Sequence, residues 1–543
     1  MRLRASDRAR TIDVRAACAV TLAVAAVALT GVWTGTARAA QVNVTVSPTP
    51  VTRPLPEGFL GLAFTYSALA QWMSASGPVD PVLVGLIRNL TPSGRPWLRI
   101  GGESADRSWW PIAGERRPLG ITYDLGPAWT EMAGRLARAT DARLMLGLEL
   151  EADQPKIDAV EARQLLHGVG ARYVQSFQIG NEPELYSAIP WYKVLHGKPV
   201  VWYSPVGKPV YARPRSYGPS QFIGEVSRIL RVIPRYPIAG PETNIPAWTQ
   251  AFLPFLKPNG RVSTLTTHAY GVNSCVKDTK SDVYPTVPNL LSLHASRDLL
   301  DGTAPYIALV HRRGGSYRID EMGAVTCTGP AGVSNSMATA LWAIDALFDA
   351  ASQGVDGVNL HTTYSRINNL FSLGFADGRW QATVQPLYYG ALLFEHADPA
   401  GSRLLNVTDG TTATLRVWAT EGSSRRVRVA IVNDSLSSDA VVRLRVPAAA
   451  GSTTGTVLRL QASNGAGAYA TRGITLGGRS FETTTTGVLA APTLEPITSH
   501  GGAWTVTVPK GSAALVTFGR SGSEANACRA STGGAGDRAG RCG

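Results

Sequence analysis

Short apolar segments that alternate with longer amphipathic ones are the feature that most restricts how this chain folds. Between about residues 55 and 397, eight apolar runs of strand length recur, at 59–66, 97–102, 143–150, 176–183, 237–242, 263–270, 317–323 and 357–364. Helical patterns lie between several of them, at 128–140, 220–233 and 336–351. Eight strands that alternate with helices predict a closed (β/α)₈ TIM barrel rather than an open sheet.

The pattern changes after about residue 400. Strand-like runs at 413–420, 425–433, 440–446, 456–461 and 504–508 are separated by Gly, Ser and Asp, and no helix-length pattern lies among them. They predict an all-β sandwich, and the alternation of Val with polar residues in 41–52 predicts a strand that could join it. The predicted organisation is an N-terminal strand (40–54), a catalytic barrel (55–400), a β-sandwich (401–520) and a flexible tail (521–543).

The N-terminus has the composition of an export signal. Five arginines, the last of them Arg15, precede the apolar stretch 16–32, and Ala37-Arg38-Ala39 supplies the small-x-small pattern that a signal peptidase cuts. We predict that residues 1–39 are a signal peptide cleaved after Ala39, so that the mature protein is secreted and has no stable membrane anchor. The alternative is that the same stretch forms a single membrane anchor.

Cysteine usage agrees with export. Once Cys18 is lost with the signal, Cys275, Cys327, Cys528 and Cys542 remain, and an even number in an exported chain predicts two disulfides. Three pairings are open, of which Cys275–Cys327 and Cys528–Cys542 close the shortest loops. Cys275 and Cys327 also follow adjacent predicted strands, whose spacing allows a bridge. The sequence has neither a CxxC pair nor an HExxH motif, so we expect no metal site.

The charge of the chain excludes little. The formal charge of +13 falls to +9 when the six Arg and two Asp of residues 1–39 are set aside. This excess favours acidic partners in general. It is not concentrated in a basic motif, so nucleic acid is not an expected partner.

Two glutamates stand at the ends of the predicted fourth and seventh strands, where a barrel enzyme carries its reactive groups. Glu182 lies in the run Gly180-Asn181-Glu182-Pro183, and Glu321 lies in Asp320-Glu321-Met322. A glutamate at one strand end is common and means little alone. Two of them on strands 4 and 7 predict a carboxylate pair that faces one site, which is the chemistry of glycoside hydrolysis.

The chain resembles glycoside hydrolase family 79, the β-glucuronidase and heparanase-like family of the clan A retaining glycosidases, over most of its mature length. The segments that carry this resemblance are LRIGGESAD (98–106), QIGNEPELY (178–186), THAY (267–270), YRIDEMG (317–323), GVNLHTTYSRI (357–367) and QPLYYGALLF (385–394). The Asn-Glu-Pro run and the strand-7 glutamate define the clan, whereas the later segments and the domain order favour the family. The resemblance implies a retaining β-glucuronidase that needs no cofactor and acts on a glycoside or oligosaccharide containing glucuronic acid.

The resemblance also assigns roles in a double displacement. Glu321 is expected to be the nucleophile and Glu182 the general acid/base. Asn181 would hydrogen-bond the sugar 2-hydroxyl or the nucleophile, and Tyr270 would donate a hydrogen bond to the nucleophile. Arg99 is an inward charge that could keep Glu321 ionised.

Other residues are expected to contact the sugar. His268 faces the same side of its strand as Tyr270, where it has either a site role or a packing role, and Glu103 could contact sugar hydroxyls. The sugar carboxylate is expected to meet Tyr364 and the backbone amides of a loop after the nucleophile, formed by Gly323, Ala324 and Val325. One departure leaves the exact sugar open, because several family members carry a glutamate where 64–67 ends in Ser67.

Other functions stay open from the sequence. A neutral-sugar glycosidase of clan A (a xylosidase or arabinofuranosidase) and an endo-acting heparanase-like enzyme both fit the glutamate pair. A non-catalytic carbohydrate-binding protein is the alternative outside enzymes. The connection 186–217 is rich in Trp and Tyr, which either stack on sugar rings or pack against each other.

Overall fold

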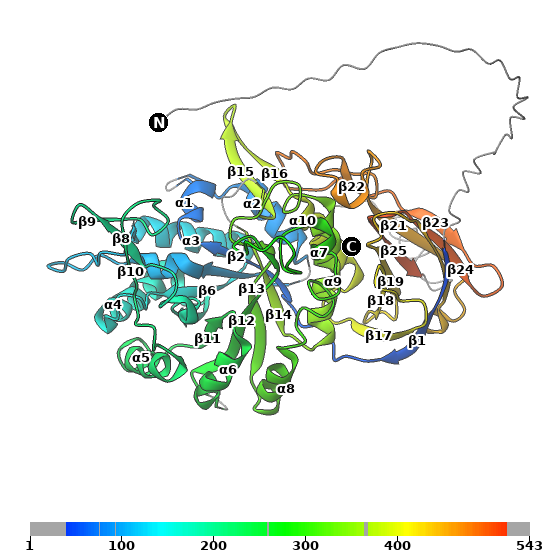
Figure 1. The fold of residues 1–543 in the computed structure, drawn as a ribbon. Coiled ribbons are helices and arrows are strands. Elements are labelled where there is room, and N and C mark those ends of the chain that lie inside the picture. The colour runs from blue at the N-terminus through cyan, green and yellow to red at the C-terminus, as the bar shows by residue number, and fades with distance from the viewer. Residues whose placement is uncertain (1–39, 75–76, 93, 258–259, 363–366, 519–543) are drawn as a thin grey trace, which may run out of the picture. The chain divides into compact units, whose positions relative to one another are not determined.

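The computed structural model describes residues 40–74, 77–92, 94–257, 260–362 and 367–518 (Figure 1). The predicted signal peptide 1–39 and the predicted bridge between Cys528 and Cys542 lie outside the described residues. Among the helices in these ranges, none has both the length and the apolar character that a membrane span requires.

Eight parallel strands close into a barrel, as predicted. In chain order they are β2 (Leu60–Thr65), β3 (Trp97–Gly101), β6 (Arg143–Leu148), β7 (Val174–Ile179), β11 (Ile238–Thr243), β12 (Val262–Asn273), β13 (Ser316–Thr326) and β14 (Gly357–His361). The barrel closes where β14 pairs with β2, with Leu360 opposite Leu62. Strands buried on both sides need continuous apolar runs, which is why the sequence made all eight visible.

Helices surround the barrel and fill the connections between its strands (Figure 1). They are α1 (Ala68–Trp72), α2 (Pro81–Asn89), α3 (Pro127–Thr140), α4 (Pro155–Leu165), α5 (Pro219–Val232), α6 (Pro246–Phe252), α7 (Val287–Leu290), α8 (Ala304–Arg312), α9 (Met337–Ser352) and α10 (Pro386–Ala397). Several begin with proline in the first turn, where the missing N–H costs no hydrogen bond. Among them, α3, α5 and α9 coincide with the predicted helical patterns.

Short strands lie in the connections that follow the carboxyl ends of the barrel strands. They are β4 (Ser108–Trp109), β5 (Tyr123–Asp124), β8 (Tyr192–Leu195), β9 (Lys198–Val200), β10 (Lys208–Val210), β15 (Phe371–Ala376) and β16 (Arg379–Val384). Strands β9 and β10 are the two edges of one small sheet around β8, and each reads Lys-Pro-Val. Lysine and proline on edge strands hinder pairing with another chain, which gives these lysines a structural reason.

The second domain is the predicted β-sandwich. Its strands are β1 (Ala40–Pro50), β17 (Arg403–Thr408), β18 (Leu415–Glu421), β19 (Val427–Asn433), β20 (Ala440–Arg445), β21 (Thr454–Ala462), β22 (Ile474–Leu476), β23 (Glu495–Thr498), β24 (Trp504–Val508) and β25 (Ser512–Phe518). All but β23, which pairs with β21 beside the path, form one hydrogen-bonded path. The path folds into two layers, since β24 at its end contacts β19 and β25 across a core. In that core the rings of Trp504 and Phe518 lie 4.7 Å apart.

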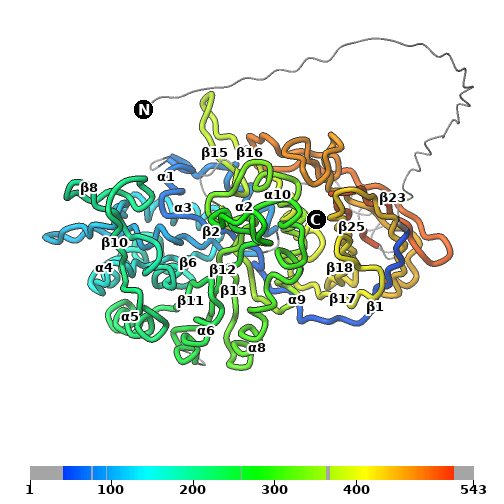
Figure 2. Tube along the Cα trace, in the orientation of Figure 1, coloured from blue at the N-terminus to red at the C-terminus, as the bar shows by residue number. Residues whose placement is uncertain are grey.

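The N-terminal strand β1 belongs to this sandwich (Figure 2). It runs parallel to β20, with Val44 opposite Leu444, and antiparallel to β17, with Val46 opposite Val407. Val44 and Val46 are completely buried. The chain therefore enters through the sandwich, builds the barrel and returns to complete the sandwich.

A buried arginine joins the two domains. Arg416 on β18 contacts Asp345 of α9 at 2.9 Å and Asp434 at 2.5 Å, and all three side chains are at most 2% exposed. The indole of Trp418 donates to the same Asp345 and stacks on Phe348 at 5.2 Å. Helix α9 is buried on every side because elements of both domains pack against it.

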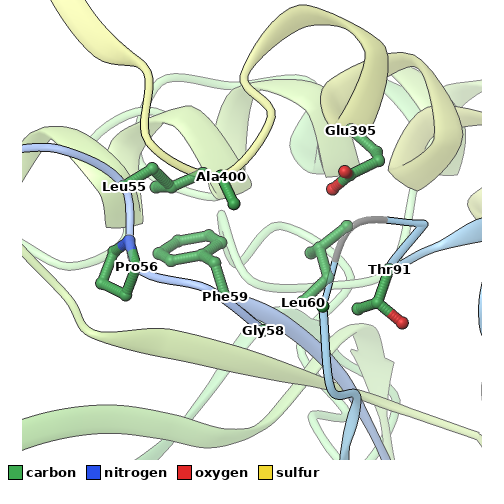
Figure 3. A pocket seen from close by; sticks show the side chains of 9 residues that line it. Leu55, Pro56, Gly58, Phe59, Leu60, Thr91, Glu395 and Ala400 are labelled. Carbon is green, nitrogen blue, oxygen red and sulfur yellow. The ribbon is translucent and has the colours of Figure 1, made fainter. Parts of the chain in front are cut away.

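A small pocket lies at the opposite end of the barrel from the strand carboxyl ends (Figure 3). It opens beside Phe59 and Leu60 at the start of β2 and is closed by Ala400 and by Glu395 of α10. Burial raises the pKa of Glu395 to about 8. This pocket is far along the strands from the ends where barrel enzymes act, so we do not place the site there.

Candidate active site

Glu321 faces the barrel interior because β13 contains a bulge. Against β12, Thr267 pairs with Ile319 and His268 pairs with Glu321, so Asp320 is an extra residue in β13. Strict alternation would send Asp320 and Glu321 to opposite faces. With the bulge both carboxylates lie in the interior, 0% and 10% exposed, and such bulges commonly re-aim side chains at active sites.

Glu182 follows β7 in a left-handed turn. Its φ is 49°, after Gly180 at 72°, and its amide donates to the carbonyl of Glu242 at 2.7 Å. A glutamate with positive φ is uncommon, and such conformations concentrate at functional sites. The turn presents the Glu182 side chain, 20% exposed, toward β12.

The two predicted catalytic carboxylates come close together. One oxygen of Glu182, one oxygen of Glu321 and a ring nitrogen of His268 all lie within 4.8 Å of one another. The Nδ1 atom of His268 is 2.8 Å from Glu182 Oε1, and Asn244 donates to the same oxygen. The two carboxylates therefore face one site.

Glu321 is surrounded by groups that favour its charged form. Arg99 donates to Oε2, and Tyr270 donates its hydroxyl hydrogen to Oε1. The Tyr270 oxygen in turn lies 2.5 Å from Nδ1 of His361. Burial alone would raise the pKa of Glu321, but the charges of His361, His268 and Arg99 hold it far below the usual value.

Arg99 on β3 holds several of the site groups at once. It is 2% exposed, and its Nη2 lies 2.7 Å from Asn181 Oδ1 and 2.7 Å from Glu242 Oε2. Its Nε donates to Gln178 at 3.2 Å. The side-chain oxygen of Asn181 therefore accepts a hydrogen bond from Arg99, while its backbone amide donates to Asp106 at 3.0 Å.

A second layer of acidic groups lies beneath the catalytic pair. Glu242 and Asp320 are both completely buried, and both accept from the Gln178 side chain. Burial works against the charge of Glu242, but Arg99 and His268 lower its pKa to about 2. Burial and the Glu242 charge together raise the pKa of Asp320 well above its usual value. One carboxylate and one neutral acid therefore share this layer.

Other predicted site residues have different surroundings. Glu103 is half exposed, forms an ion pair with Arg107 at 3.1 Å, and burial raises its pKa. The segment Gly323–Val325, expected as a loop, is instead part of β13, because it continues to pair with β12. Ala324 and Val325 are buried, and the Val325 carbonyl accepts from Asn368. Tyr364 lies outside the described residues.

The predicted Cys275–Cys327 disulfide is present. The two Cα atoms are 5.6 Å apart, within the range that a disulfide requires. Strands β12 and β13 extend together beyond the barrel to Asn273 and Thr326, and the bridge joins the chain directly after both. The disulfide therefore ties together the strand extensions next to Tyr270 and Glu321.

The structure brings in four residues that the sequence analysis did not select: Asn244, Glu242, Asp320 and His361. Glu242 had the same sequence signal as Glu182, a glutamate after an apolar run at a strand end. His361 lies inside the quoted segment 357–367, yet alternation alone did not show that its ring reaches Tyr270.

Two sets of side chains have the donor types and spacing of a metal site. They are Glu182, His268 and Glu321, and below them Glu242, His268 and Asp320. Arg99 contacts a member of each set and already supplies a positive charge to both. This arrangement describes an ion-pair network better than a metal centre.

The aromatic connection 186–217 mostly packs on itself. Tyr186 is buried, stacks on Tyr217 and donates to Asp106. Trp191 donates its indole hydrogen to the Asp106 carbonyl. An open cavity of about 340 Å³ lies beside this connection, with Trp191, Tyr192 and Tyr211 on one side and Glu151 and Arg213 on the other.

Three further buried carboxylates, which we call the outer carboxyl cluster, lie behind β6: Glu149, Asp158 and Glu161. Asp158 and Glu161 are on the inner face of α4, and Glu149 directly follows β6. Within the described part of the chain, both oxygens of Asp158, both of Glu161 and Oε2 of Glu149 have no hydrogen-bond partner. Burial raises the pKa of all three well above the usual values.

Comparison with known proteins identifies the class. Residues 415–515, which cover β18 to the middle of β25, match the sequence model of the glycosyl hydrolase family 79 C-terminal β domain. A barrel followed by this β domain is the architecture expected for a family 79 glycoside hydrolase. The resemblance to family 79 expected from the sequence is thereby confirmed. No curated protein matches the chain in sequence.

Several solved structures share the fold. A 4-O-α-L-rhamnosyl-β-D-glucuronidase from Fusarium oxysporum 12S is 18% identical with a TM-score of 0.64, over 88% of this chain and 100% of that one. A family 51 arabinofuranosidase from Xanthomonas axonopodis pv. citri is 13% identical with a TM-score of 0.59, over 88% and 100%. A family 44 endoglucanase from Clostridium thermocellum is 12% identical with a TM-score of 0.54, over the same shares. At these identities the likeness concerns the fold alone.

Proposed function

We propose that this chain is an exported retaining β-glucuronidase that releases terminal glucuronic acid by double displacement. The observation that carries the proposal is the catalytic pair, with oxygens of Glu182 and Glu321 within 4.8 Å of each other. The surroundings of the two differ in the way the mechanism needs. Glu321 is held as an anion by Arg99 and Tyr270, whereas Glu182 is more exposed and can exchange a proton with substrate or water.

In the first step Glu321 attacks the anomeric carbon, and the bond from that carbon to the leaving oxygen breaks. The leaving oxygen takes its proton from Glu182. A covalent glycosyl-enzyme results, and the negative charge has moved from Glu321 to Glu182. Tyr270, which donates to Glu321 Oε1, keeps the nucleophile oriented for the attack.

In the second step Glu182 acts as the base. A water attacks the anomeric carbon, the bond to Glu321 breaks, and the proton of the water goes to Glu182. Two inversions give a product with the configuration of the substrate. Asn244 and His268, which both contact Glu182 Oε1, orient the carboxylate through both steps.

The preference for glucuronic acid rests on the family resemblance. The family 79 β domain and the fold shared with a rhamnosyl-glucuronidase support it. By resemblance, Tyr364 and the backbone of Gly323–Val325 would bind the sugar carboxylate. Because that segment is a strand beside Tyr270, it would present backbone groups at a fixed position next to the nucleophile.

Export is proposed from the N-terminal sequence and from the disulfide. A bridge between Cys275 and Cys327 fits an oxidising compartment, since cytosolic proteins rarely keep structural disulfides. We also propose that the mature chain divides into two domains near residue 400. The change from helices to strands after α10 supports that boundary.

The test compares nitrophenyl β-glucuronide with the matched nitrophenyl β-glucoside. We expect kcat/KM to favour the glucuronide by at least about 10³-fold, because a hydroxymethyl group leaves the carboxylate-binding donors unpaired. Proton NMR of the first product should show the β-anomer. Equal rates on both glycosides, or faster release from a xyloside or arabinofuranoside, would replace glucuronic acid by a neutral sugar. An α-anomer as the first product would reject the retaining mechanism.

A further inference from the structure

Glu242 is a buried anion that the mechanism above does not use. It lies on β11 with a side chain that is 0% exposed. Its Oε2 is 2.7 Å from Arg99 Nη2 and 3.8 Å from His268 Nε2. Its Oε1 accepts from the Thr266 hydroxyl at 2.7 Å and from Gln178. It is too deep to touch a sugar, so any effect on the reaction must pass through a neighbour.

His268 is that neighbour, since it stands between Glu242 and the catalytic pair. Its ring is completely buried, with Nδ1 2.8 Å from Glu182 Oε1 and Nε2 3.8 Å from both Glu242 Oε2 and Asp320 Oδ1. Six charged and titratable groups from five elements face it: Arg99, whose Nη2 lies 3.4 Å from Nε2, Glu182, Glu242, Asp320, Glu321 and His361.

The balance of these groups favours a protonated ring. Burial lowers the pKa of His268, but the charges of Glu321, Glu182 and Glu242 raise it well above the usual value. Two of these three carboxylates change charge during the proposed reaction. Glu242 does not change, because Arg99 and the hydrogen bonds from Thr266 and Gln178 fix it as an anion.

We propose that Glu242 is a positioning residue that keeps His268 protonated throughout the catalytic cycle, so that the imidazolium balances the negative charge first on Glu321 and then on Glu182. This inference rests on the proposed double displacement. It explains why an anion is buried beneath two carboxylates that must not be ionised together. Glu242 stabilises the imidazolium of His268, and the imidazolium stabilises whichever of Glu321 and Glu182 carries the negative charge.

The negative charge passes from Glu321 to Glu182 as bonds form and break in the first step. When the bond from Glu321 to the anomeric carbon forms, its charge disappears, and the proton that leaves Glu182 for the leaving oxygen puts a charge there. Both carboxylates lie within 4.8 Å of the same ring nitrogen, so the imidazolium keeps one anionic partner in each state. In the second step Glu182 must be ionised to take the proton from water, and the cation beside it favours that form.

Loss of the Glu242 charge should therefore impair the second step more than the first. A neutral His268 leaves Glu182 without a counter-charge, which disfavours the charged form that must take the proton from water in the glycosyl-enzyme. Protonation of the leaving group instead needs the neutral acid, which loss of that cation does not disfavour. With an activated leaving group the glycosyl-enzyme should then accumulate.

The experiment uses the Glu242→Gln variant and 2,4-dinitrophenyl β-glucuronide. We expect kcat to fall about 10–100-fold, within the contribution of a general base, and KM to fall with it, so that kcat/KM changes far less. Dinitrophenolate should appear in a burst of one equivalent. Azide, which needs no base, should restore kcat and give the β-glucuronyl azide.

Two variants serve as controls. Thr266→Val removes a hydrogen bond to the same carboxylate without removing its charge, and it should show neither burst nor azide effect. Glu242→Asp keeps the charge and should restore most of kcat. Equal losses of kcat and kcat/KM in Glu242→Gln, with no azide effect, would indicate a structural role and overturn the proposal.

A substrate-free measurement separates this inference from the proposed function. NMR of ¹⁵N-labelled histidine in the wild-type protein should show His268 doubly protonated at pH 7.5, assigned by its loss in His268→Gln. A neutral His268 there overturns the proposal, even if Glu242→Gln fails to fold. If the protein cleaves no β-glucuronide, the proposed function fails, whereas the protonation of His268 is still decided.

Discussion

Two groups of buried carboxylates lie near the carboxyl ends of the barrel strands, and they differ in the cations that accompany them. In the catalytic cluster (Arg99, Glu182, Glu242, His268, Asp320 and Glu321), Arg99 contacts two of the acids directly. In the outer carboxyl cluster, neither oxygen of Asp158 or Glu161 has a hydrogen-bond partner within the described residues. Arg107 is paired with Glu103 and Glu151 instead.

The comparison teaches that burial does not decide the charge of an acid. Burial raises the pKa in both groups, because the charged form loses its water. Only where a cation is in contact is this effect reversed, as for Glu242 and Glu321. Asp158 and Glu161, which have no cation in contact, favour the neutral form, whereas Glu242 and Glu321 beside Arg99 and His268 favour the charged form.

The largest expected effect separates the two groups by activity. Glu321→Gln should lower kcat by more than about 10³-fold, because the amide cannot form the glycosyl-enzyme. Glu161→Gln is the matched change in the outer carboxyl cluster and should keep kcat within about 2-fold, since Glu161 is already neutral. Rates on the nitrophenyl glycoside and thermal unfolding of both variants check this. Near wild-type turnover in Glu321→Gln would remove it from the nucleophile role.

The sequence predicted the architecture because buried strands leave a continuous signal. All eight barrel strands were found, yet the sixth and seventh run on to Asn273 and Thr326, beyond the predicted ends at 270 and 323. Their extensions are held by pairing with each other and by the Cys275–Cys327 bridge, which are tertiary contacts. In the sandwich, β17, β22, β23 and β25 were not predicted. Half of the six residues of β17 are polar or charged, and β22 and β23 are only three and four residues long.

The site could be predicted only where single residues stand in motifs. Glu182 and Glu321 were selected from strand ends and family segments. The bulge that turns Asp320 inward with Glu321 is a matter of register and leaves no mark on the sequence. Glu242 has the same sequence signal as Glu182, a glutamate at a strand end, and only the structure shows that it pairs with Arg99. Charge partners drawn from five strands are beyond what spacing along the chain can show.

The next largest effect concerns the cation itself. Arg99→Met should lower the free energy of unfolding by about 3–5 kcal/mol at pH 7, because it leaves buried carboxylates without a partner. In the wild type the lowered pKa of Glu242, about 2, contributes stability that is present above its unfolded pKa and lost as the pH falls toward 2. The variant lacks that contribution. In addition, burying the charged carboxylates without Arg99 costs free energy. The loss should therefore grow between pH 4 and pH 8.

Urea unfolding over this pH range measures the loss in Arg99→Met. Arg459→Met is the control, since Arg459 pairs with Glu495 on the sandwich surface, where that carboxylate is 50% exposed. An exposed pair contributes about 0–1 kcal/mol, with little change over this pH range. If Arg99→Met proved as mild as Arg459→Met, the catalytic cluster would not depend on Arg99 for its charges.

The smallest expected effect has the opposite sign. Asp158→Asn should stabilise the protein by about 1 kcal/mol at pH 8 and leave it unchanged at pH 3, because the amide needs no proton to stay buried. The sign follows from the raised pKa of Asp158: the folded state binds the proton more tightly, so wild-type stability falls as the pH rises above the unfolded pKa.

Asp356→Asn provides the contrast. The pKa of Asp356 is lowered by hydrogen bonds from His311, Tyr317 and Arg53 despite burial, so its charge stabilises the fold above its unfolded pKa. That variant should destabilise the protein at pH 8 and have little effect at pH 3. Two Asp→Asn changes that moved the stability in the same direction with pH would show that burial, and not the partner, determines the charge of a buried acid in this protein.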